Sequence, residues 1–231
     1  MTAIASNLQA VNHVIAQAVG AAQRSRGEVT LLAVSKTFPD AAIRVAYQAG
    51  QLAFGESYVQ EALDKIEALR DLPLQWHFIG PIQSNKTRAI AENFSWVHSV
   101  DRLKTAERLS AQRPGDLPPL NVCIQVNVSG EASKGGVTPD RLAQLAQAVA
   151  HLPRLNLRGL MAIPAPTPGV DEQRKPFARL RELKQQISTQ GLILDTLSMG
   201  MSDDLSAAVL EGATIVRVGT AIFGERNSGE K

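Results

Sequence analysis

The sequence has 231 residues, of which 44% are hydrophobic and 20% are charged, and these values are typical of a globular protein. A formal charge of +2 without a run of Lys or Arg argues against nucleic acid as a partner, and no apolar run is long enough to span a membrane. The single cysteine, Cys123, excludes an intrachain disulfide, and residues 1–23 lack the Lys or Arg that opens a secretory signal. We therefore expect a cytoplasmic protein whose residues 1–231 form one domain.

The first part of the chain alternates apolar helical stripes with short apolar runs. Apolar residues recur at helical spacing over residues 8–22, which predicts an amphipathic helix within residues 1–23. Val29–Val34 has no polar face, which predicts a strand buried on both sides. Similar patterns predict strands at Leu52–Gly55, Leu74–Ile79 and Trp96–Val100, and helices near residues 43–49, 59–69, 84–92 and 103–109.

The rest of the chain continues this alternation. Thr138 followed by Pro139 is typical of a helix start, and Ser202 and Gly212 are expected to cap and to end a short helix. Pro176 leaves the start of a longer helix open. The strands predicted here are Leu120–Val128, Leu155–Ile163, Leu192–Leu197 and Ala213–Val218.

The order of these elements predicts the fold. Eight strands alternate with helices and no pair of strands is joined by a hairpin signal, which indicates a parallel sheet. Eight such units fit a (β/α)8 TIM barrel from about residue 28 to about residue 224. An open doubly wound sheet is the alternative, but no Gly-x-Gly-x-x-Gly follows a predicted strand. Few residues follow the eighth strand, so we expect the extra N-terminal helix to fill part of the outer ring.

In such a barrel the carboxyl ends of all strands face one mouth. Lys36 follows the first strand, where a partly buried amine can form an imine; the alternative is a lysine that extends its amine to solvent. Ser198–Ser202 and Gly219–Thr220 follow the last two strands and offer hydroxyl and backbone N–H groups to an anion. Barrels commonly bind phosphate at these two places, so the combination with Lys36 is a more specific signal than either feature alone.

Six segments of the chain together resemble one family. These segments are Leu32–Lys36, Phe54–Glu61, His77–Lys86, Gly159–Ile163, Leu197–Asp203 and Arg217–Gly224. The family that they resemble is that of the pyridoxal phosphate homeostasis proteins, relatives of the alanine racemase barrel, and the resemblance extends from near the N-terminus to Gly224.

The resemblance implies that pyridoxal 5′-phosphate (PLP) is bound as an imine to Lys36. It places the phosphate on Ser198 or Ser202, together with Gly219 and Thr220.

The resemblance also implies contacts around the ring of the cofactor. It places Arg217 by the pyridine nitrogen, and Met199 lies in the same segment as the two serines. Ser57 stands where the family motif has an Asn that would flank the ring, so we expect this contact to be shortened or lost.

The remaining polar residues have simpler interpretations. Asp203 and Asp204 are expected in the first turn of a helix, where carboxylates complement the helix dipole, and we assign them no catalytic role. Lys134 lies in a Gly- and Ser-rich loop and is an alternative site for a second, transient imine. The histidines show no metal-ligand spacing and are interpreted as separate structural residues: His13, His77, His98 and His151.

The family resemblance implies a non-catalytic protein of vitamin B6 homeostasis that binds PLP and passes it to apo PLP enzymes; we expect a monomer. An amino-acid racemase is the alternative, but racemisation needs an acid or base on each face of the substrate. The sequence contains two tyrosines: Tyr47 lies within a predicted helix, and Tyr58 is expected to pack after the second strand. An imine-forming aldolase is a third alternative, and it would be colourless when purified.

Overall fold

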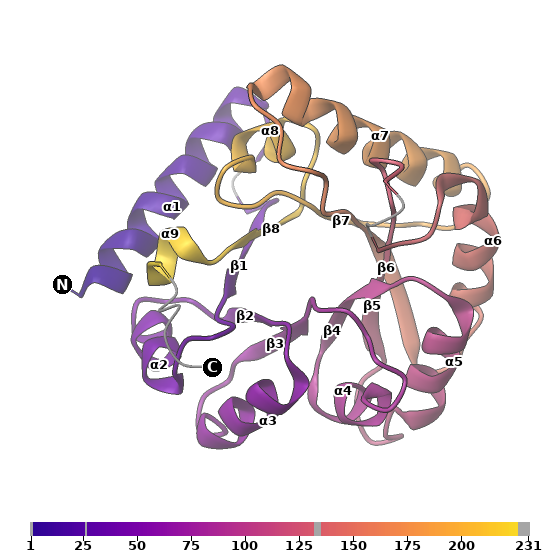
Figure 1. Cartoon of the computed structure of the whole chain (residues 1–231), viewed down its shortest axis with the longest axis horizontal. Coiled ribbons are helices and arrows are strands. Elements are labelled where there is room, and N and C mark those ends of the chain that lie inside the picture. The colour runs from indigo at the N-terminus through magenta and orange to yellow at the C-terminus, as the bar shows by residue number, and fades with distance from the viewer. Residues whose placement is uncertain (1, 26, 132–134, 226–231) are drawn as a thin grey trace.

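The computed structural model describes residues 2–25, 27–131 and 135–225. Eight parallel strands are hydrogen-bonded in chain order, and β1 pairs with both β2 and β8, so that the sheet closes into a barrel. Helices surround this barrel as an outer ring (Figure 1). The predicted (β/α)8 fold is therefore confirmed. The strands are β1 (Thr30–Val34), β2 (Ala53–Glu56), β3 (Gln75–Phe78), β4 (Trp96–Val100), β5 (Leu120–Gln125), β6 (Leu155–Met161), β7 (Thr196–Ser198) and β8 (Ile215–Val218).

The helices of the described residues follow the strands in alternation. The N-terminal helix precedes the first strand, as expected. The helices are α1 (Ala3–Ala21), α2 (Asp40–Gln48), α3 (Val59–Ala68), α4 (Thr87–Asn93), α5 (Leu103–Gln112), α6 (Pro139–Ala150), α7 (Val170–Ser188), α8 (Leu205–Leu210) and α9 (Thr220–Phe223). None of them is long and apolar enough to cross a membrane.

Side chains along a strand alternate between the inside and the outside of the barrel. On β1, Leu32 belongs to a small apolar cluster inside the barrel, whereas Leu31 and Ala33 belong to the large apolar layer beneath the helices. Both faces of the strand are therefore buried, which is why its sequence shows no polar face. The same alternation brings Val34 and then Lys36 to the carboxyl end on the inner side.

The N-terminal helix completes the outer ring. It packs beside α2, α8 and the four-residue α9, along the side of the barrel formed by β1 and β8 (Figure 1). The Asn7 amide donates to the Ile222 carbonyl over 2.9 Å, and Arg24, just beyond the helix, donates to the carbonyls of Val209 and Ala213. The expectation that this helix fills the gap left by a short closing helix is confirmed.

The segment around β7 differs from the prediction. The strand comprises Thr196–Ser198 instead of Leu192–Leu197, because Gly191 has a φ of +90° and Ile193 is 93% exposed. The following helix begins at Leu205 with Asp204 at its N-cap, so Ser202 is not the cap and the two aspartates are not in the first turn. The Asp204 carboxylate accepts a hydrogen bond from the Met201 N–H at 2.6 Å, which stabilises a turn ahead of the helix.

The start of α7 is settled by the structure. The helix begins at Val170, directly after Gly169, whose φ is +82°. Pro176 lies inside this helix, near its N-terminal end. A proline there removes one backbone N–H but does not end the helix.

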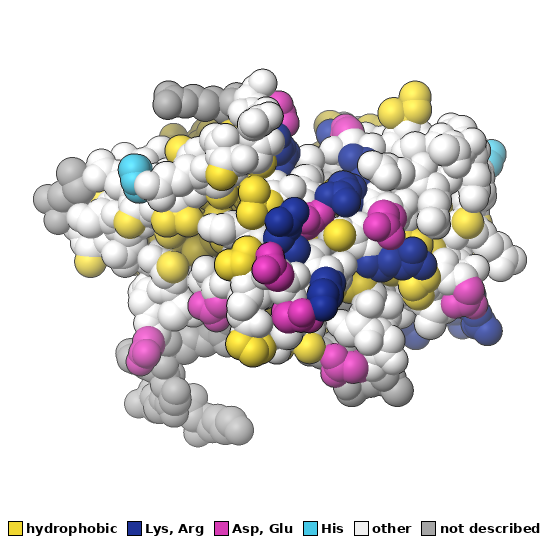
Figure 2. Space-filling view, turned by 90° about the horizontal axis from the view of Figure 1, so that it is seen from above, with side chains coloured by type: hydrophobic (Ala, Val, Ile, Leu, Met, Phe, Trp, Pro, Cys, Tyr) yellow, Lys and Arg dark blue, Asp and Glu magenta, His cyan; other side chains and the backbone are white. Residues whose placement is uncertain are grey.

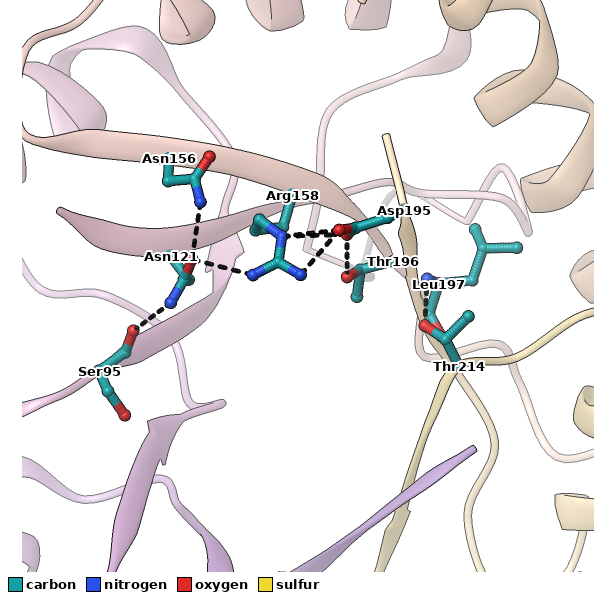
Figure 3. A network of polar contacts seen from close by, with 8 residues as sticks. All are labelled: Ser95, Asn121, Asn156, Arg158, Asp195, Thr196, Leu197 and Thr214. Atoms are coloured by element: carbon teal, nitrogen blue, oxygen red, sulfur yellow. Dashed lines mark hydrogen bonds and ion pairs between the residues drawn. The ribbon is translucent and has the colours of Figure 1, made fainter. Parts of the chain in front are cut away.

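A polar network spans the amino ends of β4 to β7, opposite the mouth (Figure 3). The Arg158 guanidinium donates to both carboxylate oxygens of Asp195, and the central carbon of the guanidinium lies 4.9 Å from the centre of the Trp96 ring. The Asn121 side-chain oxygen accepts from Arg158 at 3.2 Å and from Asn156 at 3.0 Å. These contacts tie four neighbouring strands together by their side chains.

The outer surface mixes charges of both signs. Figure 2 shows basic and acidic side chains interspersed over one face of the molecule. An exposed ion pair joins Lys175 and Glu172, whereas Arg174 and Arg181 pair with the buried Glu211. A face of mixed sign does not offer the basic patch that nucleic acids require.

The close contact of β6 with β7 yields a test of the fold. A Cβ atom added at Gly159 would lie 1.9 Å from the Thr196 carbonyl oxygen. We expect Gly159→Ala to lower the free energy of unfolding by about 1–3 kcal/mol, because the strands must move apart. Urea denaturation measures the change. Gly115→Ala is the matched control, since a Cβ there meets no atom within 4 Å, and we expect a change below about 0.5 kcal/mol. Equal effects of the two substitutions would contradict this packing.

Candidate functional site

A cavity of about 320 Å³ opens where the strand ends converge at the mouth. This volume lies at the lower end of the range of small-molecule pockets. A larger hollow of about 740 Å³ lies beside the N-terminal ends of α5 and α6, and its lining includes Asp101 and Arg102, which follow β4, but not Lys36 or Arg217. The residues that line the mouth cavity come from six strand ends: Val34, Lys36, Ser57, Ile79, Ile163, Met201, Ser202, Asp203, Arg217, Gly219 and Thr220.

Lys36 and Arg217 reach this cavity from neighbouring strands. Lys36 is half-buried and follows β1, whereas Arg217 is 4% exposed and lies within β8, paired with Leu32. Arg217 donates to the Ser198 hydroxyl at 2.8 Å and to the Ala162 carbonyl at 2.9 Å. Burial lowers the pKa of Arg217 to about 10, so the guanidinium remains protonated at neutral pH.

Hydroxyl and backbone donors form one side of the cavity. Ser202 is exposed in the turn before α8, and Thr220 is the exposed first residue of α9. Gly219 lies so close to β1 that an added Cβ would be 3.1 Å from the Val34 carbonyl oxygen. These donors suit an anion such as a phosphate, which accepts charge-assisted hydrogen bonds from hydroxyl and N–H groups.

Two of the predicted site residues do not line the cavity. Ser198 and Met199 are fully buried, and the Ser198 hydroxyl is engaged with Arg217 and with His98. The chain then bends at Gly200, whose φ is +93° and whose Cβ, if present, would lie 2.5 Å from the Ala208 Cβ. Of the two serines considered for phosphate binding, Ser202 is therefore the one at the cavity.

Ser57 lines the cavity, as does Asp203, which the sequence analysis did not assign to the site. Gly80 lies behind Ser57, since a Cβ added there would approach the Ser57 carbonyl oxygen to 2.3 Å. Lys134 lies outside the described residues.

A buried polar chain extends from Arg217 into the barrel. Beyond Ser198, His98 Nδ1 lies 2.7 Å from the serine hydroxyl oxygen, and His98 Nε2 lies 3.0 Å from His77 Nδ1. The His77 ring stacks on Trp96 with ring centres 5.4 Å apart. The sequence analysis treated these histidines as separate, but the inward positions of β3 and β4 bring them together.

The direction of the hydrogen bonds in this chain can be assigned. Arg217 donates to the Ser198 oxygen, so the hydroxyl hydrogen is available to His98 Nδ1. His98 then donates from Nε2 to His77 Nδ1, and His77 Nε2 is left without a partner among the described residues. Burial lowers the pKa of His77 to about 3 and that of His98 well below 6.5, so both rings are neutral. This series of hydrogen-bonded side chains orients Arg217 without adding charge.

Across the described part of the molecule, no group of three or more His, Cys, Asp or Glu side chains is placed to hold a metal ion.

The structure is a parallel barrel with a lysine, a buried arginine and hydroxyl donors at one mouth. Its class is that of the alanine racemase barrels, since residues 6–227 match the family model "Alanine racemase, N-terminal domain". The chain is 63% identical over 229 residues to the pyridoxal phosphate homeostasis protein of Pseudomonas aeruginosa, covering 99% of this chain and 98% of that protein. It is 52% identical to the protein of the same name from Escherichia coli K12, over the full length of both.

A solved structure shows the same architecture. PipY of Synechococcus elongatus, solved with PLP bound, matches with a TM-score of 0.84 and 40% identity, covering 96% of this chain and 100% of PipY. The chain belongs to the pyridoxal phosphate homeostasis protein family, as its motifs indicated.

The two buried histidines predict a loss of stability in acid. Because their pKa values are lowered in the folded state, the unfolded chain binds protons more readily below pH 6.5, and stability falls as the pH falls. From about pH 7 to about pH 5.5 we expect each histidine to reduce the free energy of unfolding by about 1 kcal/mol. Urea denaturation at both pH values measures this loss.

The variant His77→Gln, which can still hydrogen-bond His98, should show about half of this loss. The control His13→Gln removes an exposed histidine and should behave as the unmodified protein. The assignment is wrong if His77→Gln retains the full acid sensitivity.

Proposed function

We propose that this protein binds PLP in the mouth cavity, holds it through the amine of Lys36, and serves intracellular PLP homeostasis without turning over a substrate. One observation carries the proposal. Lys36 lines the same small cavity as Arg217, Ser202 and Thr220, in a chain 63% identical to a pyridoxal phosphate homeostasis protein.

The side chains of the cavity fit the functional groups of PLP. The Lys36 amine suits the aldehyde, and the Ser202 and Thr220 hydroxyls suit the phosphate. Apolar side chains line the rest of the cavity and suit the ring: Val34, Ile79, Ile163 and Met201. Ser57 contributes a short polar group at the same mouth. When bound, PLP supplies an electron sink for reactions of amino acids.

Arg217 is assigned to the ring nitrogen. Its guanidinium stays protonated and is held by two hydrogen bonds, so it donates to an acceptor without releasing a proton. A pyridine nitrogen next to a permanent cation stays unprotonated. Arg217 in this position therefore favours the binding of PLP, but it does not make the ring a strong electron sink.

The described residues supply no obvious acid for a second face of a substrate. Tyr58 is 56% exposed at the N-cap of α3 and does not line the cavity, and Tyr47 lies within α2. The Asp203 carboxylate is next to Ser202, on the side assigned to phosphate. This arrangement favours a carrier over an amino-acid racemase, which needs two opposed acid–base groups.

Further parts of the proposal concern the cellular role. The exposed Ser202 and Thr220 leave the phosphate side of the cavity open, which supports release of PLP to apo PLP enzymes. We also propose that residues 1–231 act as one domain, as a monomer, in the cytoplasm.

The phosphate assignment predicts selective losses of affinity. Thr220→Ala and Ser202→Ala should each weaken PLP binding by about 1–3 kcal/mol, because a charge-assisted hydrogen bond is lost. Their affinity for pyridoxal, which lacks the phosphate, should stay unchanged. Absorbance titration of the apo-protein with both ligands measures this. Ser206→Ala, which removes an exposed serine from α8, is the control. If pyridoxal and PLP bind the unmodified protein equally well, the assignment fails.

The carrier assignment predicts binding without turnover. Borohydride reduction of the PLP-loaded protein should label Lys36, which peptide mapping detects. Incubation of the loaded protein with amino acids in deuterated water should produce no exchange at Cα, because a ring nitrogen beside Arg217 stays unprotonated and the electron sink is weak. It should produce no racemisation, because a second acid–base group is missing. Addition of an apo PLP enzyme should then restore the activity of that enzyme.

Each outcome of this experiment has a clear meaning. Rapid exchange or racemisation would identify an enzyme, and labelling of a different lysine would overturn the assignment of Lys36. A protein that stays colourless with PLP would favour an imine-forming aldolase.

A further inference from the structure

The turn that carries Lys36 has an unfavourable backbone conformation. Thr37 has a φ of +70°, in the left-handed region that β-branched residues rarely adopt. Such a conformation persists when surrounding contacts impose it, and it is found most often at functional sites. The contacts that impose it are therefore of interest for the placement of Lys36.

Two side chains of α3 hold the backbone on both sides of Lys36. Lys65 Nζ donates to the Ser35 carbonyl at 2.8 Å, and Glu61 Oε1 accepts from the Thr37 N–H at 2.6 Å. Glu61 and Lys65 are also ion-paired with each other, so the two contacts form one unit. We call Glu56, Glu61 and Lys65 the turn clamp.

Glu56 of β2 anchors this clamp inside the protein. Its carboxylate is fully buried, pairs with Lys65 at 2.8 Å, and accepts from the Ser35 hydroxyl at 2.7 Å. Its second oxygen has no hydrogen-bond partner among the described residues. Replacement of a buried ion pair by apolar side chains is often neutral or stabilising. The clamp is therefore better explained by the position that it imposes than by stability.

On the side that faces α3, the turn is not covered by closely packed apolar side chains. A hollow of about 560 Å³ lies there, lined among others by Thr37, Phe38, Glu61 and Lys65. On the other side, Phe38 stacks on Phe223 of α9 with ring centres 5.1 Å apart. The turn is thus held by aromatic packing toward α9 and by polar contacts toward α3.

We propose that Glu61 and Lys65, anchored by Glu56, are positioning residues that hold the Lys36 amine in place for its covalent link to PLP. This inference rests on the proposed function of Lys36. The clamp acts through the backbone of residues 35–37, and a role in fold stability alone would not affect the covalent link selectively.

The test compares an aldehyde ligand with a ligand that cannot form an imine. Glu61→Ala removes the acceptor of the Thr37 N–H. We expect it to weaken PLP binding roughly tenfold, since an amine that is in its binding position for only about a tenth of the time lowers the apparent affinity by that fraction. Binding of pyridoxine 5′-phosphate, which has an alcohol in place of the aldehyde, should stay unchanged. The Thr37 amide should exchange with solvent roughly tenfold faster in the apo-protein.

Three further variants complete the design. Glu61→Gln keeps an oxygen for the Thr37 N–H and should restore PLP binding at least in part. Glu61→Asp keeps a carboxylate near Lys65 but shortens the side chain away from the Thr37 N–H, so it should weaken PLP binding. If Glu61→Ala does not fold, Glu61→Asp tests the positioning role in its place. Glu67→Ala removes an exposed glutamate of the same helix, ion-paired with Arg70, and should match the unmodified protein.

The outcomes separate this inference from the proposed function. Equal weakening of both ligands, or faster Thr37 exchange with unchanged PLP binding, would overturn the positioning role while the proposed function stands. If the unmodified protein does not bind PLP, the proposed function fails, and with it the role of the clamp toward PLP. Selective loss of the aldehyde ligand with Glu61→Asp or Glu61→Ala, and not with Glu67→Ala, supports the inference.

Discussion

The burial of the Arg217 guanidinium inside the barrel is the constraint on which the rest of the site depends. A buried charge is tolerated when its donors are paired, and here the partners are the Ser198 hydroxyl and the Ala162 carbonyl. Ser198 is held in turn by His98, so the end of β7 is drawn into the interior as far as the bend at Gly200. Ser202 lies beyond this bend, at the cavity. The hydrogen bonds of Arg217 thus divide the segment Ser198–Ser202 into a buried part, which begins at Ser198, and a part that lines the cavity, which includes Ser202.

Most of the fold could be predicted because parallel strands are buried on both faces and helices on one. That difference appears directly in the sequence as runs without a polar face and as stripes at helical spacing. The errors occurred where tertiary contacts override local pattern. Leu192–Leu197 contains enough apolar residues for a strand, but Ile193 faces solvent and pairing starts at Thr196. The helix expected to be capped by Ser202 begins at Leu205, because the Asp204 carboxylate bonds back to Met201.

The positions of the cavity residues could be predicted where they depend only on which strand each residue follows. Lys36, Ser202 and Thr220 follow different strands, and closure of the barrel brings them to one cavity. Contacts between side chains of different elements left no such signal. The His77–His98 pair depends on the relative register of β3 and β4, and the turn clamp depends on how α3 packs beside the end of β1.

The protonation states around the cavity argue for retention of a cofactor over turnover of a substrate. General acid–base catalysis requires a group whose pKa lies near the working pH. Burial keeps the imidazoles of His77 and His98 neutral, and Arg217 keeps its proton with a pKa of about 10. The inner side of the cavity is therefore a fixed hydrogen-bond donor that exchanges no proton at neutral pH. In the proposed function Ser202 and Thr220 are occupied by the phosphate, and an amino acid that replaces Lys36 on PLP leaves one acid–base group, the released lysine amine, where racemisation needs two. The same hydrogen bonds that make the site selective for PLP thus leave it poorly equipped to move protons on a bound amino acid.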